Sequence, residues 1–114
     1  MTGQDLYNEI SRLREKIDYA QNMIKKHGLD AASAKRKYSI AFTQEQLIEK
    51  DRGMAITILD KQVKGKKHIA DLMFDWDCAE VNYDAAKRGL DNYKKQLTVV
   101  FEFYKMENYR AGQD

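Results

Sequence analysis

The chain has 114 residues, 33% of them charged, and a net charge of +2, a balance too even to indicate nucleic-acid or membrane binding by itself. No apolar run approaches the ~20 residues of a membrane span, and the N-terminal segment lacks the apolar stretch of a signal peptide. The single cysteine excludes an intrachain disulfide framework, so we expect one soluble domain over residues 1–114 in the reducing cytoplasm.

A first helix is expected from about residue 4 to about residue 51, in a chain without proline to interrupt it. Thr2 and Asp5 have the spacing of a capping box at its start. The heptad pattern after them keeps one register across Gly28, which favours a continuous helix with a glycine that costs about 1 kcal/mol. The expected seam positions are Leu6, Ile10, Leu13, Ile17, Ala20, Ile24, His27, Ala31, Ala34, Tyr38, Ala41, Glu45 and Ile48.

A short helix is predicted next, from about residue 57 to about residue 63. Thr57 and Asp60 again have capping-box spacing, and Gly65 is placed to end the helix as its C′ residue. The apolar residues between them lie on one face, which predicts that this helix packs against its neighbours.

A second long helix is predicted from about residue 66 to about residue 110, and it has the most regular pattern in the chain. Apolar residues alternate at spacings of three and four over about five heptads, without a charge, which is typical of a coiled coil. The seam positions are Ile69, Leu72, Trp76, Ala79, Tyr83, Ala86, Leu90, Tyr93, Leu97, Val100 and Tyr104.

These elements predict an all-α fold, a coiled-coil-like antiparallel hairpin of two long helices with the short helix at its tip. In such a hairpin the basic Lys35 and Lys37 would lie near the acidic Glu80 and Asp84, which favours the arrangement. One two-helix seam is too narrow to bury every apolar residue, so we expect a homodimer or a higher oligomer. The candidate oligomer interface consists of Ile40, Phe42, Phe74, Val81, Phe101 and Phe103.

The sequence offers little for catalysis or metal binding. His27 occupies a seam position without a partner at ligand spacing, and Asp71 and Asp75 are acids near a helix N-terminus, which the helix dipole favours. Cys78 lacks a neighbour that would lower its pKa, so we expect it to pack beside the seam. We therefore predict no catalytic residue, no metal site and no cofactor.

A basic cluster surrounds the predicted tip and leaves two interpretations open. It forms either a solvated loop that keeps the tip soluble or a binding site for nucleic acid or a small charged nucleotide. The basic tip cluster consists of Arg52, Lys61, Lys64, Lys66, Lys67 and His68.

Several short segments, spread over about residues 20 to 110, together suggest a family. They are Tyr38–Ala41, Ala55–Ile58, Lys64–Gly65, Ile69–Leu72, Ala79–Val81 with Tyr83, and Glu107–Asn108. On these segments the chain resembles small helical proteins encoded among the early replication and recombination genes of temperate phages of Gram-positive bacteria. Because that family has no established biochemical activity, the resemblance implies a phage context and not a mechanism.

Two departures from the family pattern matter. The family often has proline just before the threonine of the tip, where this chain has Ala55 and Ile56. It tends to be basic early in the second long helix, where this chain has Asp75 and Asp77, and this difference weakens any proposal that the helix lies on DNA.

The sequence thus favours a non-enzymatic phage accessory protein that acts as a helical protein–protein interaction module. It would bind itself and a host or phage protein in the cytoplasm of an infected or lysogenic bacterium, and modulate replication, recombination or host defence. The alternatives are a nucleic-acid-binding protein that uses the basic tip cluster and a protein that sequesters a signalling nucleotide.

Overall fold

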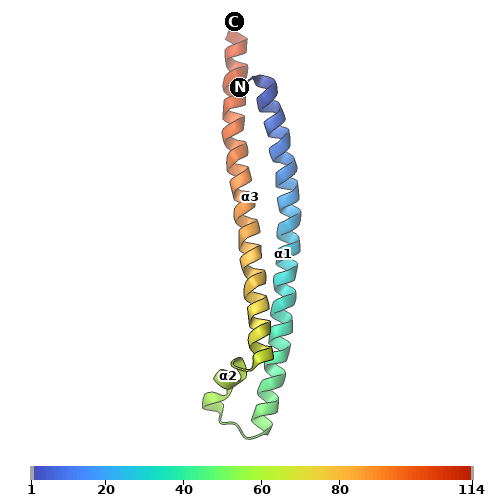
Figure 1. The fold of residues 1–114 in the computed structure, drawn as a ribbon. Coiled ribbons are helices and arrows are strands. Elements are labelled where there is room, and N and C mark those ends of the chain that lie inside the picture. Colours follow the sequence, from blue (N-terminus) through green and yellow to red (C-terminus); the bar gives the residue numbers. More distant parts are fainter. Residues whose placement is uncertain (1, 114) are drawn as a thin grey trace. The chain divides into compact units, whose positions relative to one another are not determined.

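The structure, a computed structural model, describes residues 2–113 of the chain (Figure 1). Helix α1 spans Gly3–Asp51, α2 spans Ile56–Lys64 and α3 spans Lys67–Gln113, and no strand occurs within the described range. The all-α prediction is confirmed, and a long helix packs against another.

The start of α1 has the reciprocal cap that the sequence predicts. The backbone N–H of Thr2 donates to Asp5 Oδ2 at 3.2 Å, and the backbone N–H of Asp5 donates to Thr2 Oγ1 at 3.1 Å. The hydrogen bond from the Thr2 backbone lowers the pKa of the Asp5 carboxyl. The helix then continues without a break through Gly28, as its single heptad register predicts.

The chain divides into two compact units. The terminal unit combines the chain up to Lys25 with the chain from Asp84 onward, and the central unit runs from Lys26 to Tyr83. Each unit pairs a segment of α1 with a segment of α3, and the central unit also contains α2. The expectation of a single domain over residues 1–114 stays a prediction.

In the terminal unit, the α1 segment has the most deeply buried residues. Leu6 and Leu13 are almost inaccessible to solvent, and Ile10 and Ala20 are also buried. Basic side chains of α1 cover aromatic rings of α3, with the Arg14 guanidinium 5.7 Å from the Phe101 ring centroid. Lys16 Nζ lies 5.7 Å from the Tyr93 ring centroid. The later residue of α1 thus contacts the earlier residue of α3, so the two segments run antiparallel.

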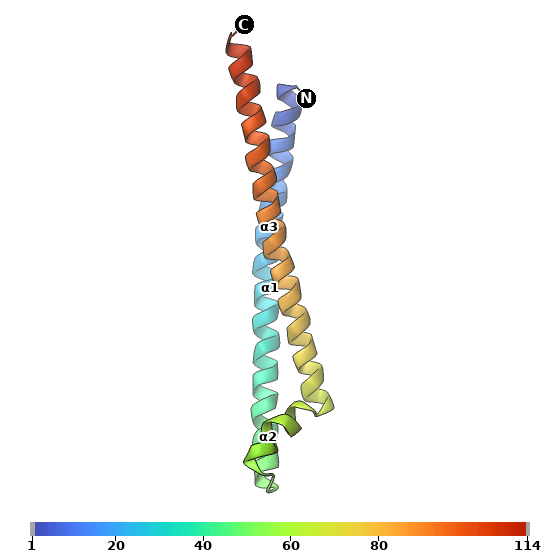
Figure 2. The ribbon, with the colours of Figure 1, turned by 90° about the vertical axis from the view of Figure 1, so that its left-hand side faces the viewer.

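The core of the central unit is built from all three helices. Tyr38 of α1, Leu59 and Val63 of α2 and Ile69 of α3 form one buried cluster, against which Trp76 and other half-buried side chains pack. Figure 2 shows α2 beside the C-terminal end of α1, where its two buried residues close this cluster. The short helix therefore packs on the other two helices through Leu59 and Val63.

Two details of the short helix differ from the predictions. Ala55 is the N-cap residue of α2 and provides no side-chain cap, so the predicted capping box of Thr57 and Asp60 is wrong. Asp60 instead accepts a hydrogen bond from Gln46 Nε2 at 2.7 Å and joins α2 to α1. Gly65 has φ −79°, an ordinary right-handed value, rather than the left-handed conformation of a C′ glycine.

Near the end of α1 the buried face turns away from the predicted seam. Ile48, a predicted seam position, is 42% exposed, whereas the neighbouring Glu49 is only 8% exposed.

The expected pairing of Lys35 with Glu80 is also replaced by another contact. Trp76 lies between them, because Lys35 Nζ is 5.8 Å from the Trp76 ring centroid and Trp76 Nε1 donates to Glu80 at 3.2 Å.

Candidate functional site

Three residues of the basic tip cluster, Arg52, Lys66 and His68, contact acidic residues of α1. Lys66 Nζ donates to Glu45 Oε2 at 2.6 Å and to Glu49 Oε1 at 2.5 Å. These hydrogen bonds, first the one to Glu45, raise the pKa of the Lys66 ammonium, and the hydrogen bond to Lys66 lowers the pKa of both carboxyls. The Lys66 side chain is only 28% exposed, so this member of the cluster does not belong to a fully solvated loop.

Two further members of the cluster join the same carboxylates. His68 Nε2 lies 3.2 Å from Glu45, and the Arg52 guanidinium donates to Glu49 at 3.1 Å. Lys67 pairs with Asp71, one turn further along α3, at 2.7 Å.

Within the described part of the chain, Lys61 and Lys64 are exposed and have no ion-pair partner. The structure therefore brings Arg52, Lys66 and His68 together as a structural network and leaves only two cluster residues as free cations. Sequence reasoning missed Glu49, although its i,i+4 spacing from the seam residue Glu45 was a signal that both face the same side.

Chemistry-bearing residues elsewhere stay apart. Residues 2–113 contain no group of three or more His, Cys, Asp or Glu side chains that could hold a metal ion. Asp71 is paired with Lys67, and His27 is half-buried on α1. Cys78 is exposed, so the prediction that it packs beside the seam is wrong, because that part of α3 turns Trp76 and Ala79 inward instead.

The candidate oligomer residues fall into two groups. Phe42 packs against the buried cluster of the central unit, with its ring 5.6 Å from that of Tyr38, and Phe101 lies under the Arg14 guanidinium. These two positions are therefore at least partly covered within the chain. The exposed positions are Ile40, Phe74, Val81 and Phe103.

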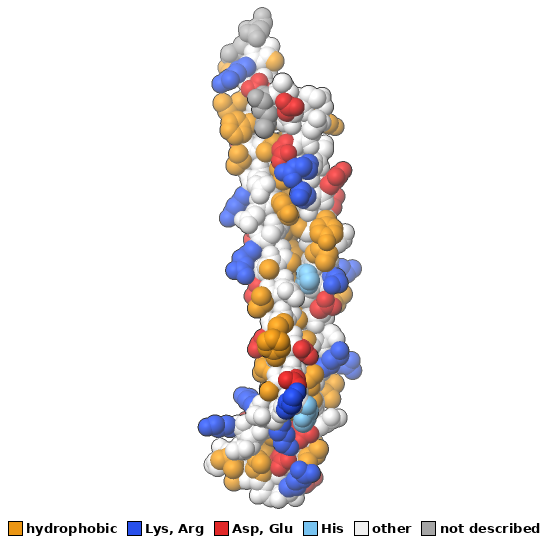
Figure 3. Space-filling view, in the orientation of Figure 1, with side chains coloured by type: hydrophobic (Ala, Val, Ile, Leu, Met, Phe, Trp, Pro, Cys, Tyr) orange, Lys and Arg blue, Asp and Glu red, His pale blue; other side chains and the backbone are white. Residues whose placement is uncertain are grey.

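A row of exposed apolar side chains runs along α3 in the terminal unit. Val99, Phe103, Met106 and Tyr109 are each about half exposed or more, and we call them the C-terminal apolar row. Their spacing of four, three and three places them on one side of the helix. Figure 3 shows hydrophobic side chains at the surface over the C-terminal part of α3. Sequence reasoning identified only Phe103, because charged neighbours interrupt the pattern around the others.

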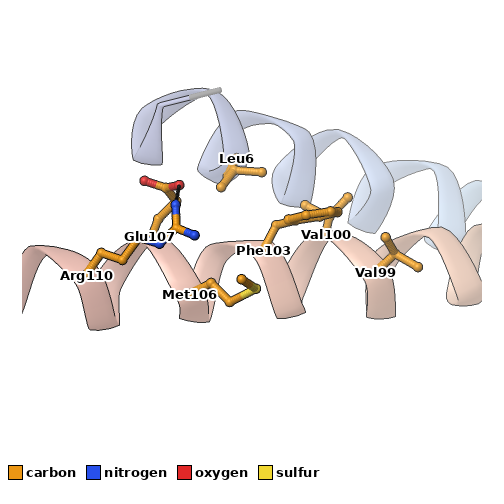
Figure 4. Close-up of a pocket in the computed structure, with 7 residues that line it drawn as sticks. All are labelled: Leu6, Val99, Val100, Phe103, Met106, Glu107 and Arg110. Atoms are coloured by element: carbon orange, nitrogen blue, oxygen red, sulfur yellow. Dashed lines mark ion pairs between the residues drawn. The ribbon is translucent and has the colours of Figure 1, made fainter.

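A hollow of about 460 Å³ lies beside this row. Figure 4 shows the side chains that line it. The helix α1 contributes Leu6 to its wall and α3 contributes the rest, including Phe103 and Met106. The polar side chains in the wall are Glu107 and Arg110, which form an ion pair at 4.0 Å. The complete lining is Leu6, Val99, Val100, Phe103, Met106, Glu107 and Arg110.

The chemistry of this wall suits the burial of an apolar side chain. A mostly apolar hollow with one ion pair at its edge offers packing and orientation. Among the described residues, no helix is both long and apolar enough to cross a membrane.

Comparison with known proteins gives no match: no family model, curated protein or solved structure is similar to the chain. The phage resemblance of its short segments therefore stays an expectation.

Proposed function

We propose that this protein is non-enzymatic and acts as a helical protein–protein interaction module. The observation that carries the proposal is the C-terminal apolar row beside the hollow of the terminal unit. Large apolar side chains exposed next to one another are typical of an interaction surface, whereas single exposed ones are ordinary.

The row has the geometry that another helix recognises. Side chains at i, i+4 and i+7, here Val99, Phe103 and Met106, are the anchors by which one helix packs on another. Complete burial of a large apolar side chain contributes about 1.5–3 kcal/mol, and these residues retain about half of their exposed surface for a partner to cover.

Charged residues flank the row on one edge and at its C-terminal end. Glu102 and Lys105 on one edge and Arg110 near the end are all mostly exposed. An apolar centre with a polar, solvated rim is the usual composition of a protein–protein interface, and the rim charges select the partner and its orientation.

We further propose that the interaction serves a phage. The protein would modulate replication, recombination or host defence in the cytoplasm of an infected or lysogenic bacterium. This part of the proposal is supported by the resemblance of the short segments at Tyr38–Ala41, Ala55–Ile58 and Ala79–Val81.

The nucleic-acid alternative has one observation in its favour, the exposed and unpaired Lys61 and Lys64. The ion pairs of Lys66 and Lys67 weigh against it, because a paired ammonium releases fewer counterions when it meets a phosphate. We expect no retardation of duplex or single-stranded DNA even at low salt. Retardation that disappears in Lys61→Glu/Lys64→Glu would favour the alternative.

The test of the proposed function changes the row and keeps the seams. Phe103→Ser/Met106→Ser should abolish binding to a partner protein captured by the parent chain, while helical content measured by circular dichroism stays the same. Phe74→Ser is the matched control, since Phe74 is an exposed apolar residue of α3 in the other unit. Unchanged capture by the double variant, or equal loss in the control, would contradict the proposal.

A further inference from the structure

We infer that the C-terminal apolar row binds the same row of a second copy of this chain, with the two α3 segments antiparallel. The inference rests on the proposed function and names the partner for the surface described above. It is carried by the arrangement of apolar and charged residues along the row.

The first three members of the C-terminal apolar row, continued to Arg110, have the spacing of a two-helix seam. Val99, Phe103, Met106 and Arg110 follow one another at intervals of four, three and four residues, which is the alternation of paired helices. Three of these positions are apolar, and the fourth is an arginine whose side chain is mostly exposed. The seam formed by these four positions is therefore apolar at its start and cationic at its end.

This asymmetry decides the direction of pairing. In a parallel pair, Arg110 would face Arg110 of the partner subunit, and two like charges would meet in the seam. In an antiparallel pair, a two-fold axis lies between Phe103 and Met106. Arg110 then faces Val99 of the partner subunit, and its aliphatic stem packs on that valine while its guanidinium reaches solvent.

The central layers of the antiparallel pair match in shape and chemistry. Phe103 of one copy faces Met106 of the partner subunit, and symmetry repeats the contact. A thioether beside an aromatic ring is a favourable contact, and methionine adapts to irregular gaps. The hollow beside Phe103 and Met106 gives the incoming side chain a space lined by apolar groups.

The charges on the edge of the row also match in this register. At 1.5 Å per residue, Glu102 lies within about 3 Å along the axis of the level of Tyr109 of the partner subunit. It lies within about 4.5 Å of the level of Arg110 of the partner subunit, close enough for these long side chains to meet. Each copy thus offers a carboxylate to the hydroxyl and guanidinium of the other.

Within one chain, Glu102 and Arg110 already have ion-pair partners, but these pairs are weak competitors for the contacts across the dimer. Glu102 pairs with Lys105 at 3.5 Å and Arg110 pairs with Glu107 at 4.0 Å, each within one turn of α3. Exposed pairs of this kind contribute little to stability, so exchanging them for contacts across a dimer has a low cost.

The experiment is sedimentation velocity of the full chain across the micromolar range, with a charge-swap series. The parent should approach twice its chain mass of 13.3 kDa. Glu102→Arg and Arg110→Glu should each weaken association about tenfold or more, because each places like charges together. The combination of both changes should restore association to within about threefold of the parent, since the opposite signs return.

Each outcome decides a separate point. The inference is overturned if the parent sediments at the mass of one chain. It is also overturned if the parent dimerises and the association is unchanged by Glu102→Arg, Arg110→Glu and Phe103→Ser/Met106→Ser. If the parent is monomeric but Phe103→Ser/Met106→Ser abolishes capture of another protein, the proposed function stands and only the second copy is rejected. If neither self-association nor capture depends on the row, both proposals fail. Circular dichroism of every variant excludes unfolding as the cause.

Discussion

The ammonium of Lys66 lies 2.5 Å from the carboxylate of Glu49, whose side chain is 11% exposed. Lys66 precedes α3 and Glu49 belongs to the last turn of α1, so this contact fastens the junction between α2 and α3 to the end of α1. The same ammonium donates a second hydrogen bond to Glu45, so two residues of α1 hold Lys66.

Removing this cation should destabilise the fold more than removing its neighbour. Lys66→Met should lower the melting temperature, because the shielded carboxylates of Glu45 and Glu49 lose their principal partner. Lys67→Met is the matched control, since the Lys67 side chain is 90% exposed and pairs only with Asp71. Thermal unfolding followed by circular dichroism compares them, and an equal or larger loss in Lys67→Met would refute the structural role of Lys66.

The same network predicts a loss of stability in acid. The hydrogen bond to Lys66 lowers the pKa of the Glu45 and Glu49 carboxyls from their ordinary value of 4.5. Because the pKa is lower in the folded chain than in the unfolded chain, the unfolded chain binds the proton more tightly. The carboxylate therefore stabilises the fold at pH values above 4.5. That contribution is lost as the pH falls below 4.5 and passes through the folded-state pKa.

Urea unfolding at a series of pH values measures this effect. The parent should lose stability as the pH falls below 4.5, whereas Glu45→Gln/Glu49→Gln should be less stable at neutral pH and lose less stability in acid. Parallel curves for the two proteins would show that the acid sensitivity has another source.

Glycine in the interior of α1 should be replaceable by alanine but not by a larger residue. A Cβ at Gly28 would lie 3.4 Å from the Tyr83 ring, which is ordinary contact, so Gly28→Ala should raise the free energy of unfolding by up to about 1 kcal/mol. Gly28→Leu should lower it, because the side chain must displace Tyr83. Gly89→Ala is the control, because a Cβ at Gly89 would meet no atom within 4 Å. Urea unfolding measures both variants, and destabilisation by Gly28→Ala but not by Gly89→Ala would contradict the prediction.

The loop between α1 and α2 requires its glycine. Gly53 has φ 91°, a value that L-residues rarely adopt, so Gly53→Ala should cost about 1–2 kcal/mol in chemical denaturation. Gly65→Ala provides the comparison, since its φ of −79° is ordinary and a Cβ there meets nothing closer than 3.6 Å. Equal effects of the two substitutions would argue against strain at Gly53.

The helices could be predicted from the sequence because their signals are local. The cap of Thr2 and Asp5 and the seam from Leu6 to Ala41 depend only on spacing along one helix, and the same holds for the seam of α3. Continuity through Gly28 followed from an unbroken register.

What could not be predicted depends on where α2 lies. The cluster that contains Leu59 and Val63 of α2 partly covers Phe42, and the segment after α2 places Lys66 on Glu49. No periodicity along α1 contains that information. The C-terminal apolar row escaped recognition for a different reason. A charged residue stands between its members, so the pattern becomes visible only when the exposure of each side chain is known.

The position of Trp76, the only tryptophan of the chain, makes the central unit optically distinct. Its ring lies tilted against that of Tyr38, with the two centroids 5.6 Å apart, and its Nε1 donates to Glu80. Its fluorescence should therefore change when this core opens and should not report on the terminal unit. Circular dichroism at the helix bands reports both units together. Melting curves that coincide in the two signals therefore mean that the units unfold as one cooperative structure, and curves that separate give each unit its own transition.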